Sequence, residues 1–150
     1  MNLWKFLTIV SVSLWLGAMI FFSAFVASAA FSVLDRESAG RLVGTVFPRY
    51  YFFGMVLGSL ALSGVVRRFL LGGPLPWGAL VLLLMMLGIS GFSLLVLLPQ
   101  LQASRPAIPG GSLTFARLHG LSVVLNLATI LAGLTLVFIE GLRVRRRAVT

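Results

Sequence analysis

The chain has 150 residues, of which 59% are hydrophobic and 10% are charged, and its mean hydropathy is +1.09. Soluble domains carry roughly 25% charged residues, so this composition excludes an ordinary water-soluble fold and indicates an integral membrane protein. The net charge of +9 comes from basic residues that flank apolar blocks. That distribution is typical of membrane topology and contact with membrane lipids, and we expect no nucleic-acid partner.

Four apolar blocks are each long enough for a membrane-spanning helix, which needs about 20 residues. We expect spans at about 3–34, 48–71, 76–101 and 113–139, followed by a basic tail at 140–150. The first block exceeds the roughly 7 to 15 apolar residues of a signal peptide, so we predict that it is a retained helix. The predicted fold class is an all-α integral membrane protein, a single four-transmembrane-helix bundle.

The segment before the second span is expected to be helical as well. Residues 38–47 form a short extra helical segment in this prediction, and Pro48 either starts the second span or kinks a longer helix.

An even number of spans places both termini on one side of the membrane. That side carries Lys5, Arg67, Arg68 and the "RVRRR" tail, which outnumber the basic residues of the other side. The positive-inside rule therefore predicts cytoplasmic termini in a bacterial-type inner membrane or its equivalent. Glu140 is expected to pair with this basic cluster.

Polar side chains recur along one face of the fourth block. Steps of 4, 3, 4, 3 and 4 residues place them in a stripe roughly 80° wide, which comprises Phe115, His119, Ser122, Asn126, Thr129 and Gly133. A polar stripe that faces lipid costs several kcal/mol, so it should face other helices or a cavity. Either these side chains only hydrogen-bond between helices, or they line a ligand pocket in which Asn126 is the central contact.

Small residues suggest matching faces on the other helices. In the first span these are Ser13, Gly17, Ala24 and Ser28; in the second Tyr51, Gly54, Gly58 and Ala61; in the third Gly88 and Gly91. Such faces allow tight helix packing, although the GxxxG pair of the second span would equally serve a subunit contact in a homo-oligomer.

His119 is expected close to the non-cytoplasmic interface, in a basic vestibule rimmed by tyrosines. The residues expected there are Arg36, Arg41, Arg49, Arg105, Arg117, Tyr50 and Tyr51. A vestibule of this kind suits a carboxylate, a phosphate or a lipid headgroup. Equally, these arginines would reach lipid headgroups or pair with Asp35 and Glu37.

These patterns favour a non-enzymatic membrane protein that binds or transports a small amphiphilic or anionic ligand. The predicted ligand-binding residues are His119, Ser122, Asn126, Arg41, Arg49, Tyr51 and Arg117. One alternative is a structural or assembly protein, and a second is a haem or quinone redox protein that uses His119. No catalytic set is apparent, and we expect no cofactor and no metal, because one histidine cannot supply two haem ligands.

Several strings resemble a known family. They are "LWLGAMIFFSAFVASAAF", "GRLVGTVFPRYYFFG", "LLPQLQ" and "FARLHGLSVVLNLATILAGL". The chain is similar to a small four-helix membrane family of unknown function that includes the vertebrate transmembrane protein linked to cisplatin resistance. The resemblance implies motif positions at Trp15, Gly17, Phe31, Arg41, Pro48, Tyr50, Tyr51, Pro99, Phe115, His119, Ser122 and Asn126. It implies no settled activity, and Ser28 stands where many relatives have a proline.

Overall fold

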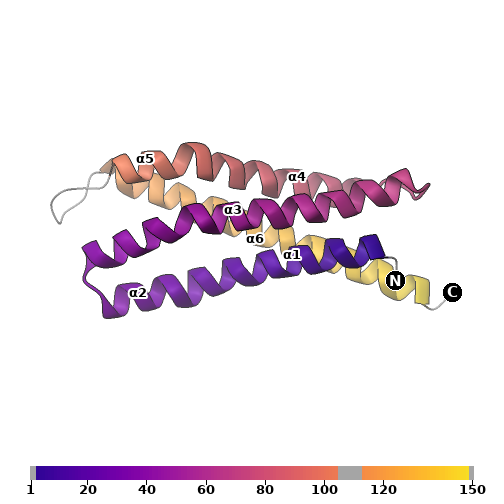
Figure 1. The fold of residues 1–150 in the computed structure, drawn as a ribbon, viewed down its shortest axis with the longest axis horizontal. Coiled ribbons are helices and arrows are strands. Elements are labelled where there is room, and N and C mark those ends of the chain that lie inside the picture. Colours follow the sequence, from indigo (N-terminus) through magenta and orange to yellow (C-terminus); the bar gives the residue numbers. More distant parts are fainter. Residues whose placement is uncertain (1–2, 105–112, 149–150) are drawn as a thin grey trace.

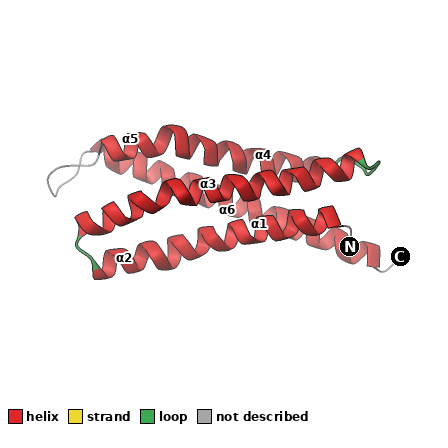
Figure 2. Cartoon of the chain, viewed as in Figure 1, coloured by secondary structure: helices red, strands yellow, loops and turns green. Residues whose placement is uncertain are grey.

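Helices make up all the regular structure in the part of the chain that the computed structural model describes, residues 3–104 and 113–148, with side chains to Leu142 (Figure 2). The first stretch consists of α1 (Leu3–Phe21), a π-helical turn η1 (Phe22–Val26) and α2 (Ala27–Val33). The second is one helix, α3 (Arg36–Leu70). The third consists of α4 (Trp77–Phe92), a π-helical turn η2 (Ser93–Leu97) and α5 (Leu98–Ala103), and the fourth is α6 (Leu113–Ala148).

Four stretches are long and apolar enough to cross a membrane, which confirms the predicted number of spans. They run over Leu3–Val33, Arg36–Leu70, Trp77–Ala103 and Leu113–Leu142. The protein is therefore an all-helical chain with the features of a multi-pass membrane protein.

Residues 38–47 are helical as predicted, and they belong to one long helix, because α3 runs unbroken through Pro48. Of the two alternatives for Pro48, the start of the second span is wrong and the longer helix is confirmed. A proline inside a helix removes one backbone donor and crowds the carbonyl four residues earlier. That earlier residue is Gly44, which has no side chain to add to the crowding. In the same turn the Arg49 guanidinium donates to the Thr45 carbonyl oxygen at 2.8 Å. Ala39 and Val43 also bury their side chains against the first span, so packing holds the early turns of α3 in place.

Local signals in the sequence set both ends of α3. The Asp35 carboxylate accepts hydrogen bonds from the backbone N–H groups of Ser38 and Glu37, at 2.9 and 3.0 Å. These bonds hold the pKa of Asp35 below its ordinary value of 3.8, and the bond from Ser38 has the larger effect. The capping carboxylate therefore stays charged at neutral pH. At the other end Gly72 takes φ +83°, and the N–H groups of Gly72 and Gly73 bond back to the carbonyls of Phe69 and Arg68.

The four spans lie side by side as an up-and-down bundle, with both chain ends at the same end of the molecule (Figure 1). The first span packs against α3 and α6, and α4 packs between α3 and α6. Among the described residues, α2 contacts α3, and the Phe22 ring of η1 packs on Phe47 and Tyr50 of α3. In that part of the chain, neither η1 nor α2 makes a close backbone contact with α6. The bundle is therefore closed around α1 and more open beside α2.

The core has two parts. The larger cluster fills the bundle between α1, α3, α4 and α6, around residues such as Trp15, Leu83 and Leu136. The smaller one lies where α2 meets the start of α3 and contains Phe22, Ala30, Ala39 and Val43. Tyr50 packs against both clusters.

The small-residue face of the second span lies inside the bundle as predicted. A methyl group on Gly54 would strike the Trp15 indole nitrogen, and one on Gly58 would lie 2.6 Å from both Trp15 and Leu87. A methyl on Gly64 would lie 2.5 Å from the Thr8 hydroxyl. These glycines therefore let α1 and α4 approach α3, and the GxxxG pair is used within the chain.

The small-residue face predicted for the first span is wrong. Ser13, Gly17, Ala24 and Ser28 are all exposed, and the inward side of α1 instead carries Thr8, Ser11, Val12, Trp15 and Met19. In the third span Gly88 is likewise exposed, and nothing lies within 4 Å of where a methyl on Gly88 or Gly91 would be. Small size alone does not distinguish an inward helix face from an outward one.

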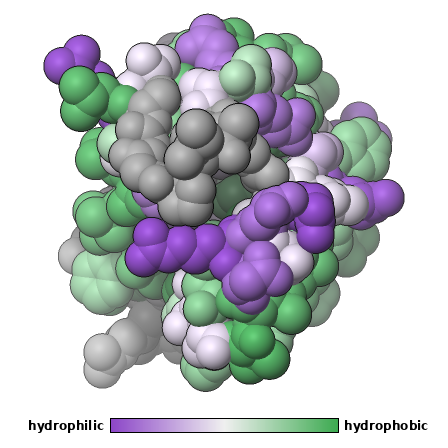
Figure 3. Space-filling model, turned by 90° about the vertical axis from the view of Figure 1, so that its left-hand side faces the viewer, coloured by the Kyte–Doolittle hydropathy of each residue, from purple (hydrophilic) through white to green (hydrophobic). Residues whose placement is uncertain are grey.

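Large apolar side chains cover the outside of the bundle, including Phe21, Phe25, Leu95, Val124 and Phe138, each at least 60% exposed. Such a surface would aggregate in water and suits a hydrocarbon environment. Seen from the end that carries α2 and α5, hydrophilic residues gather on the end face while hydrophobic residues lie around it (Figure 3). The outer surface thus has the pattern of a bilayer-embedded bundle with a polar end.

Candidate functional site

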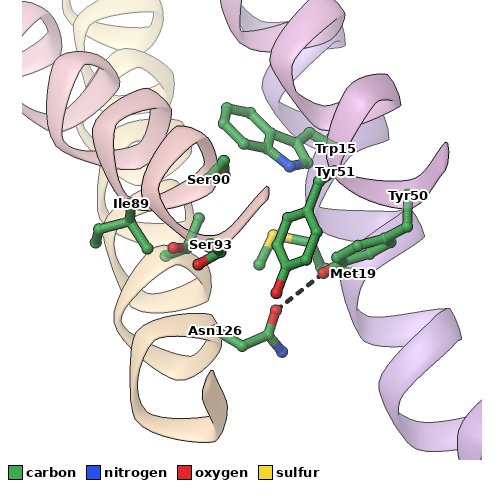
Figure 4. Close-up of a pocket in the computed structure, with 9 residues that line it drawn as sticks. Trp15, Met19, Tyr50, Tyr51, Ile89, Ser90, Ser93 and Asn126 are labelled. Atoms are coloured by element: carbon green, nitrogen blue, oxygen red, sulfur yellow. Dashed lines mark hydrogen bonds between the residues drawn. The ribbon is translucent and has the colours of Figure 1, made fainter. Parts of the chain in front are cut away.

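A chain of side-chain hydrogen bonds joins three spans at Asn126. The Tyr50 hydroxyl of α3 donates to Asn126 Oδ1 at 2.9 Å (Figure 4), and Asn126 Nδ2 donates to the Ser23 hydroxyl at 3.2 Å. Ser23 lies in the π-helical turn η1. We call these three residues the Asn126 relay. Amide and hydroxyl groups that bond across helices satisfy polar atoms that lipid cannot.

The relay borders a small cavity between the four spans (Figure 4). Its free volume of about 10 Å³ is roughly what one water molecule needs. The residues that line it are Trp15, Met19, Tyr50, Tyr51, Ile89, Ser90, Ser93, Asn126 and Thr129. A cavity of this size accommodates one small chemical group and not a whole amphiphile.

Both π-helical turns supply residues to this region. Ser23 of η1 belongs to the relay, and Ser93 of η2 lines the cavity and is 2% exposed. A π-helical turn bonds residues five apart instead of four, so it changes which side chains face inward. Such turns occur frequently at functional sites, which adds weight to this part of the bundle.

An aromatic cluster holds the tyrosines in place. The Phe22 ring lies 5.2 Å from that of Tyr50 and 5.3 Å from that of Phe47. Tyr51 lies 5.1 Å from Tyr50 and stacks on Phe47 at 5.8 Å. Aromatic pairs at these separations favour fixed mutual orientations, so the two hydroxyl groups reach the cavity on rigid side chains.

The predicted polar stripe of α6 divides into two parts. Thr129 is buried and Asn126 is half-buried, so its deeper part faces the bundle as expected. His119 is exposed and stacks on Phe115 with 6.0 Å between ring centroids. Ser122 donates to the His119 carbonyl of its own helix at 2.8 Å. The expectation that the whole stripe faces inward is therefore wrong for His119, because α2 does not pack against this part of α6.

The predicted arginine vestibule is not joined by any contact among the described residues. Arg41 is exposed and pairs with Glu37 at 2.8 Å, and its second nitrogen donates to Ser38. Arg49 bonds within α3, Arg117 is exposed, and Arg105 lies outside the described residues. The pairing of Arg41 with a nearby acid is confirmed, and a shared role of these arginines in ligand binding stays a prediction.

The family model for a domain of unknown function, DUF4149, matches residues 10–107, which is most of the chain. The chain belongs to this family. A relative of similar sequence is an uncharacterized protein of Aquifex aeolicus (strain VF5), 34% identical over 138 residues that cover 89% of this chain and 93% of the relative. No solved structure matches. Neither comparison links this DUF4149 protein to the vertebrate transmembrane protein whose family the sequence resembles.

Several residues of the site were not predicted. Trp15, Ser23, Ser90 and Ser93 supply polar groups around Asn126, yet the sequence pattern pointed to none of them as ligand contacts. Ser23 and Ser93 lie in the π-helical turns, where a count of 100° per residue fails. Ser90 and Trp15 occur in apolar runs that carry no periodic polar signal.

A second polar group lies at the end of the bundle that carries the chain ends. Glu140 is fully buried, and its Oε2 atom lies 2.9 Å from Arg68 and 3.6 Å from Lys5. This confirms the expected pairing of Glu140 with local basic residues. In the described residues no cluster of three or more histidine, cysteine or acidic side chains could hold a metal ion.

Proposed function

We propose that this DUF4149 protein binds a small amphiphilic molecule of the membrane, whose polar group bonds at the Asn126 relay. The observation that carries the proposal is the exposure of the relay: Ser23 is exposed and Asn126 is only half-buried. A purely structural hydrogen-bond chain would be expected deep within the bundle. This one lies at its edge, beside the side of α6 that α2 leaves uncovered.

The relay has bonding capacity left over. An asparagine amide offers two donors and two lone pairs, and Asn126 uses one donor to Ser23 and one lone pair for Tyr50. The remaining donor and lone pair would be costly if they faced hydrocarbon alone. A ligand that presents an ester, hydroxyl or amide at this depth would satisfy them.

The position of the relay in the bundle fits an amphiphile. Asn126 lies about 21 Å along α6 from Glu140, at roughly 1.5 Å per residue, and about 13 Å from Arg117 in the other direction. Because a hydrocarbon core is about 30 Å thick, the relay would lie below one interface and Arg117 close to it. An amphiphile whose polar neck bonds at Asn126 would then have its headgroup toward that interface.

The cavity favours binding over passage through the bundle. Its volume of about 10 Å³ admits a single small group, so the body of an amphiphile would lie against the outside of α6 and the first span. Transport of a whole ligand would need the helices to separate. Binding from the membrane side needs no such change.

The test compares lipid retention in two variants of α6. Asn126→Leu removes the relay, while Thr135→Val changes an exposed residue whose hydroxyl bonds only to the Leu131 carbonyl. Each protein is purified from phosphatidylglycerol nanodiscs, and bound lipid is measured by native mass spectrometry. We expect the Asn126 variant to lose bound lipid and the Thr135 variant to keep it.

If both variants retain the same amount of lipid, the proposal is wrong. If Asn126→Leu instead lowers thermal stability while no small molecule co-purifies with the wild type, the relay serves helix packing, as the alternative of an assembly protein predicts. An ultraviolet-visible spectrum of the same sample tests the haem alternative at His119, for which a Soret band is required.

A distant relationship to the vertebrate cisplatin-resistance protein stays a prediction from the sequence.

A further inference from the structure

Hydrogen-bond donors that line the cavity remain without an acceptor among the described residues. Trp15 is 3% exposed and lines the cavity, and its indole N–H bonds to no other described residue. The Ser90 hydroxyl also lines the cavity and bonds to none of the residues described. Ser93 interacts with the Tyr51 hydroxyl beside it. In Figure 4 the Trp15 indole nitrogen is on the side of the ring that faces Tyr51 and Met19.

Two neighbouring polar side chains already bond within the protein. Asn126 Oδ1 accepts from Tyr50, and the Thr129 hydroxyl donates to the Leu125 carbonyl of its own helix. An indole nitrogen can only donate, and the Trp15 N–H has no acceptor among the described residues. The cavity therefore offers this donor to a group that accepts.

The indole is held rigidly in this position. Trp15 packs directly on Gly54 and Gly58, where any side chain on α3 would collide with the ring. The ring thus cannot turn away without opening the contact between α1 and α3. Fixed donors of this kind favour one bound group in one place.

We infer that the cavity is a socket for the carbonyl oxygen of a lipophilic molecule, bonded by the Trp15 indole N–H. This inference rests on the proposed function, since it names the group that the bound amphiphile presents. A volume of about 10 Å³ accepts one oxygen atom and excludes a phosphate, which is larger and charged. An ammonium group has donors only, so it could not accept from the Trp15 indole N–H.

Carbonyl groups come to a membrane protein from two sources, the ester linkages of phospholipids and the ketones of quinone-like molecules. Indole nitrogen-15 spectra of the full chain distinguish them. The protein is placed in ester-linked phosphatidylglycerol nanodiscs, in nanodiscs of the ether-linked analogue, which has no carbonyl group, and in the latter with added decylubiquinone. Trp15→Phe assigns the signal.

We expect the Trp15 indole proton to resonate downfield in one carbonyl-containing sample relative to the ether-linked discs. A shift in the ester-linked discs identifies the phospholipid ester, and a shift with decylubiquinone identifies a ketone. The same resonance position in all three samples would overturn the inference.

Retention measurements separate this inference from the proposed function. Trp15→Phe should weaken lipid retention about fivefold, which corresponds to one lost hydrogen bond, and the exposed Trp77→Phe should not change it. If Asn126→Leu loses its lipid but the wild-type indole signal never moves, the proposed function stands and the carbonyl socket fails. If the signal moves but Asn126→Leu keeps its lipid, the relay has no part in binding. Should Trp15→Phe fail to fold, the wild-type spectra still decide.

Discussion

Glu140 is the residue on which the charge balance of the bundle end depends. It is fully buried, and Lys5 of α1 and Arg68 of α3 both contact its Oε2 atom. Two further nitrogens of Arg68, Nε and Nη2, are buried without a hydrogen-bond partner among the described residues. Two cations thus contact one anion, and the removal of that anion would take from the largely buried Arg68 guanidinium the carboxylate that it contacts.

Glu140→Gln should therefore destabilise the protein by about 3–5 kcal/mol, the usual cost of breaking a buried ion pair from one side. Unfolding followed in mixed detergent measures this difference. The matched control is Glu37→Gln, because Glu37 pairs with Arg41 in an exposed contact and its loss should cost less than about 1 kcal/mol. Equal stability of Glu140→Gln and the wild type would contradict a stabilising role for this ion pair.

Single residues of the site differ in how far the sequence reveals them. Asn126 could be predicted, because an amide at helical spacing from Ser122 and Thr129 is costly in lipid. Ser23 could not be predicted, because its contact with Asn126 depends on the π-helical turn η1. The bulky apolar residues around Ser23 give no sequence signal for such a turn. The exposure of His119 could not be predicted either, since it depends on how far α2 lies from α6.

At the scale of helices, the close approach of α1 and α4 to α3 depends on glycine. Gly58→Ala would place a methyl group 2.6 Å from the Trp15 ring, which is rigid, and equally close to Leu87. We expect a loss of about 1–3 kcal/mol, the usual cost of overpacking a core. Thermal unfolding in detergent provides the measurement.

Gly88→Ala is the control for this substitution. Gly88 is exposed and has nothing within 4 Å of a new methyl group, and alanine is the better helix former. Its stability should equal or exceed that of the wild type. A destabilised Gly88 variant alongside an unchanged Gly58 variant would contradict the helix packing described above.

The elements themselves were largely predictable because hydrophobic length determines a membrane span. All four spans were expected, and their ends differ from the helix ends by a few residues, apart from the start of α3 and the end of α6. The sequence left open whether the second helix begins at Pro48 or runs through it. The early turns of α3 are stabilised because Ala39 and Val43 pack on Phe22 and Ala30. No local sequence signal reveals this packing, which lets the helix extend through Pro48.

At the scale of the whole molecule, the two ends of the bundle differ in construction. The end with the chain termini is closed by the contacts of Glu140 with α1 and α3. Toward the other end α2 packs against α3 and, within the described chain, makes no close backbone contact with α6. Among the described residues, the bond from Asn126 to Ser23 is therefore the last hydrogen bond between the first span and α6 in this direction. Under the proposed function, this asymmetry would give the ligand one side from which to enter.

The orientation of the bundle can be tested directly, because the chain has no cysteine of its own. Single cysteines at Gln102 and Leu71, both exposed and at opposite ends of the bundle, report on the two faces of the membrane. The excess of basic residues beside the termini predicts that an impermeant maleimide labels Gln102→Cys in intact cells and Leu71→Cys only in inverted vesicles. The reverse pattern would contradict cytoplasmic termini but keep the bundle. Labelling of both from the same side would contradict the up-and-down arrangement, since α4, η2 and α5 together connect the two positions across the membrane.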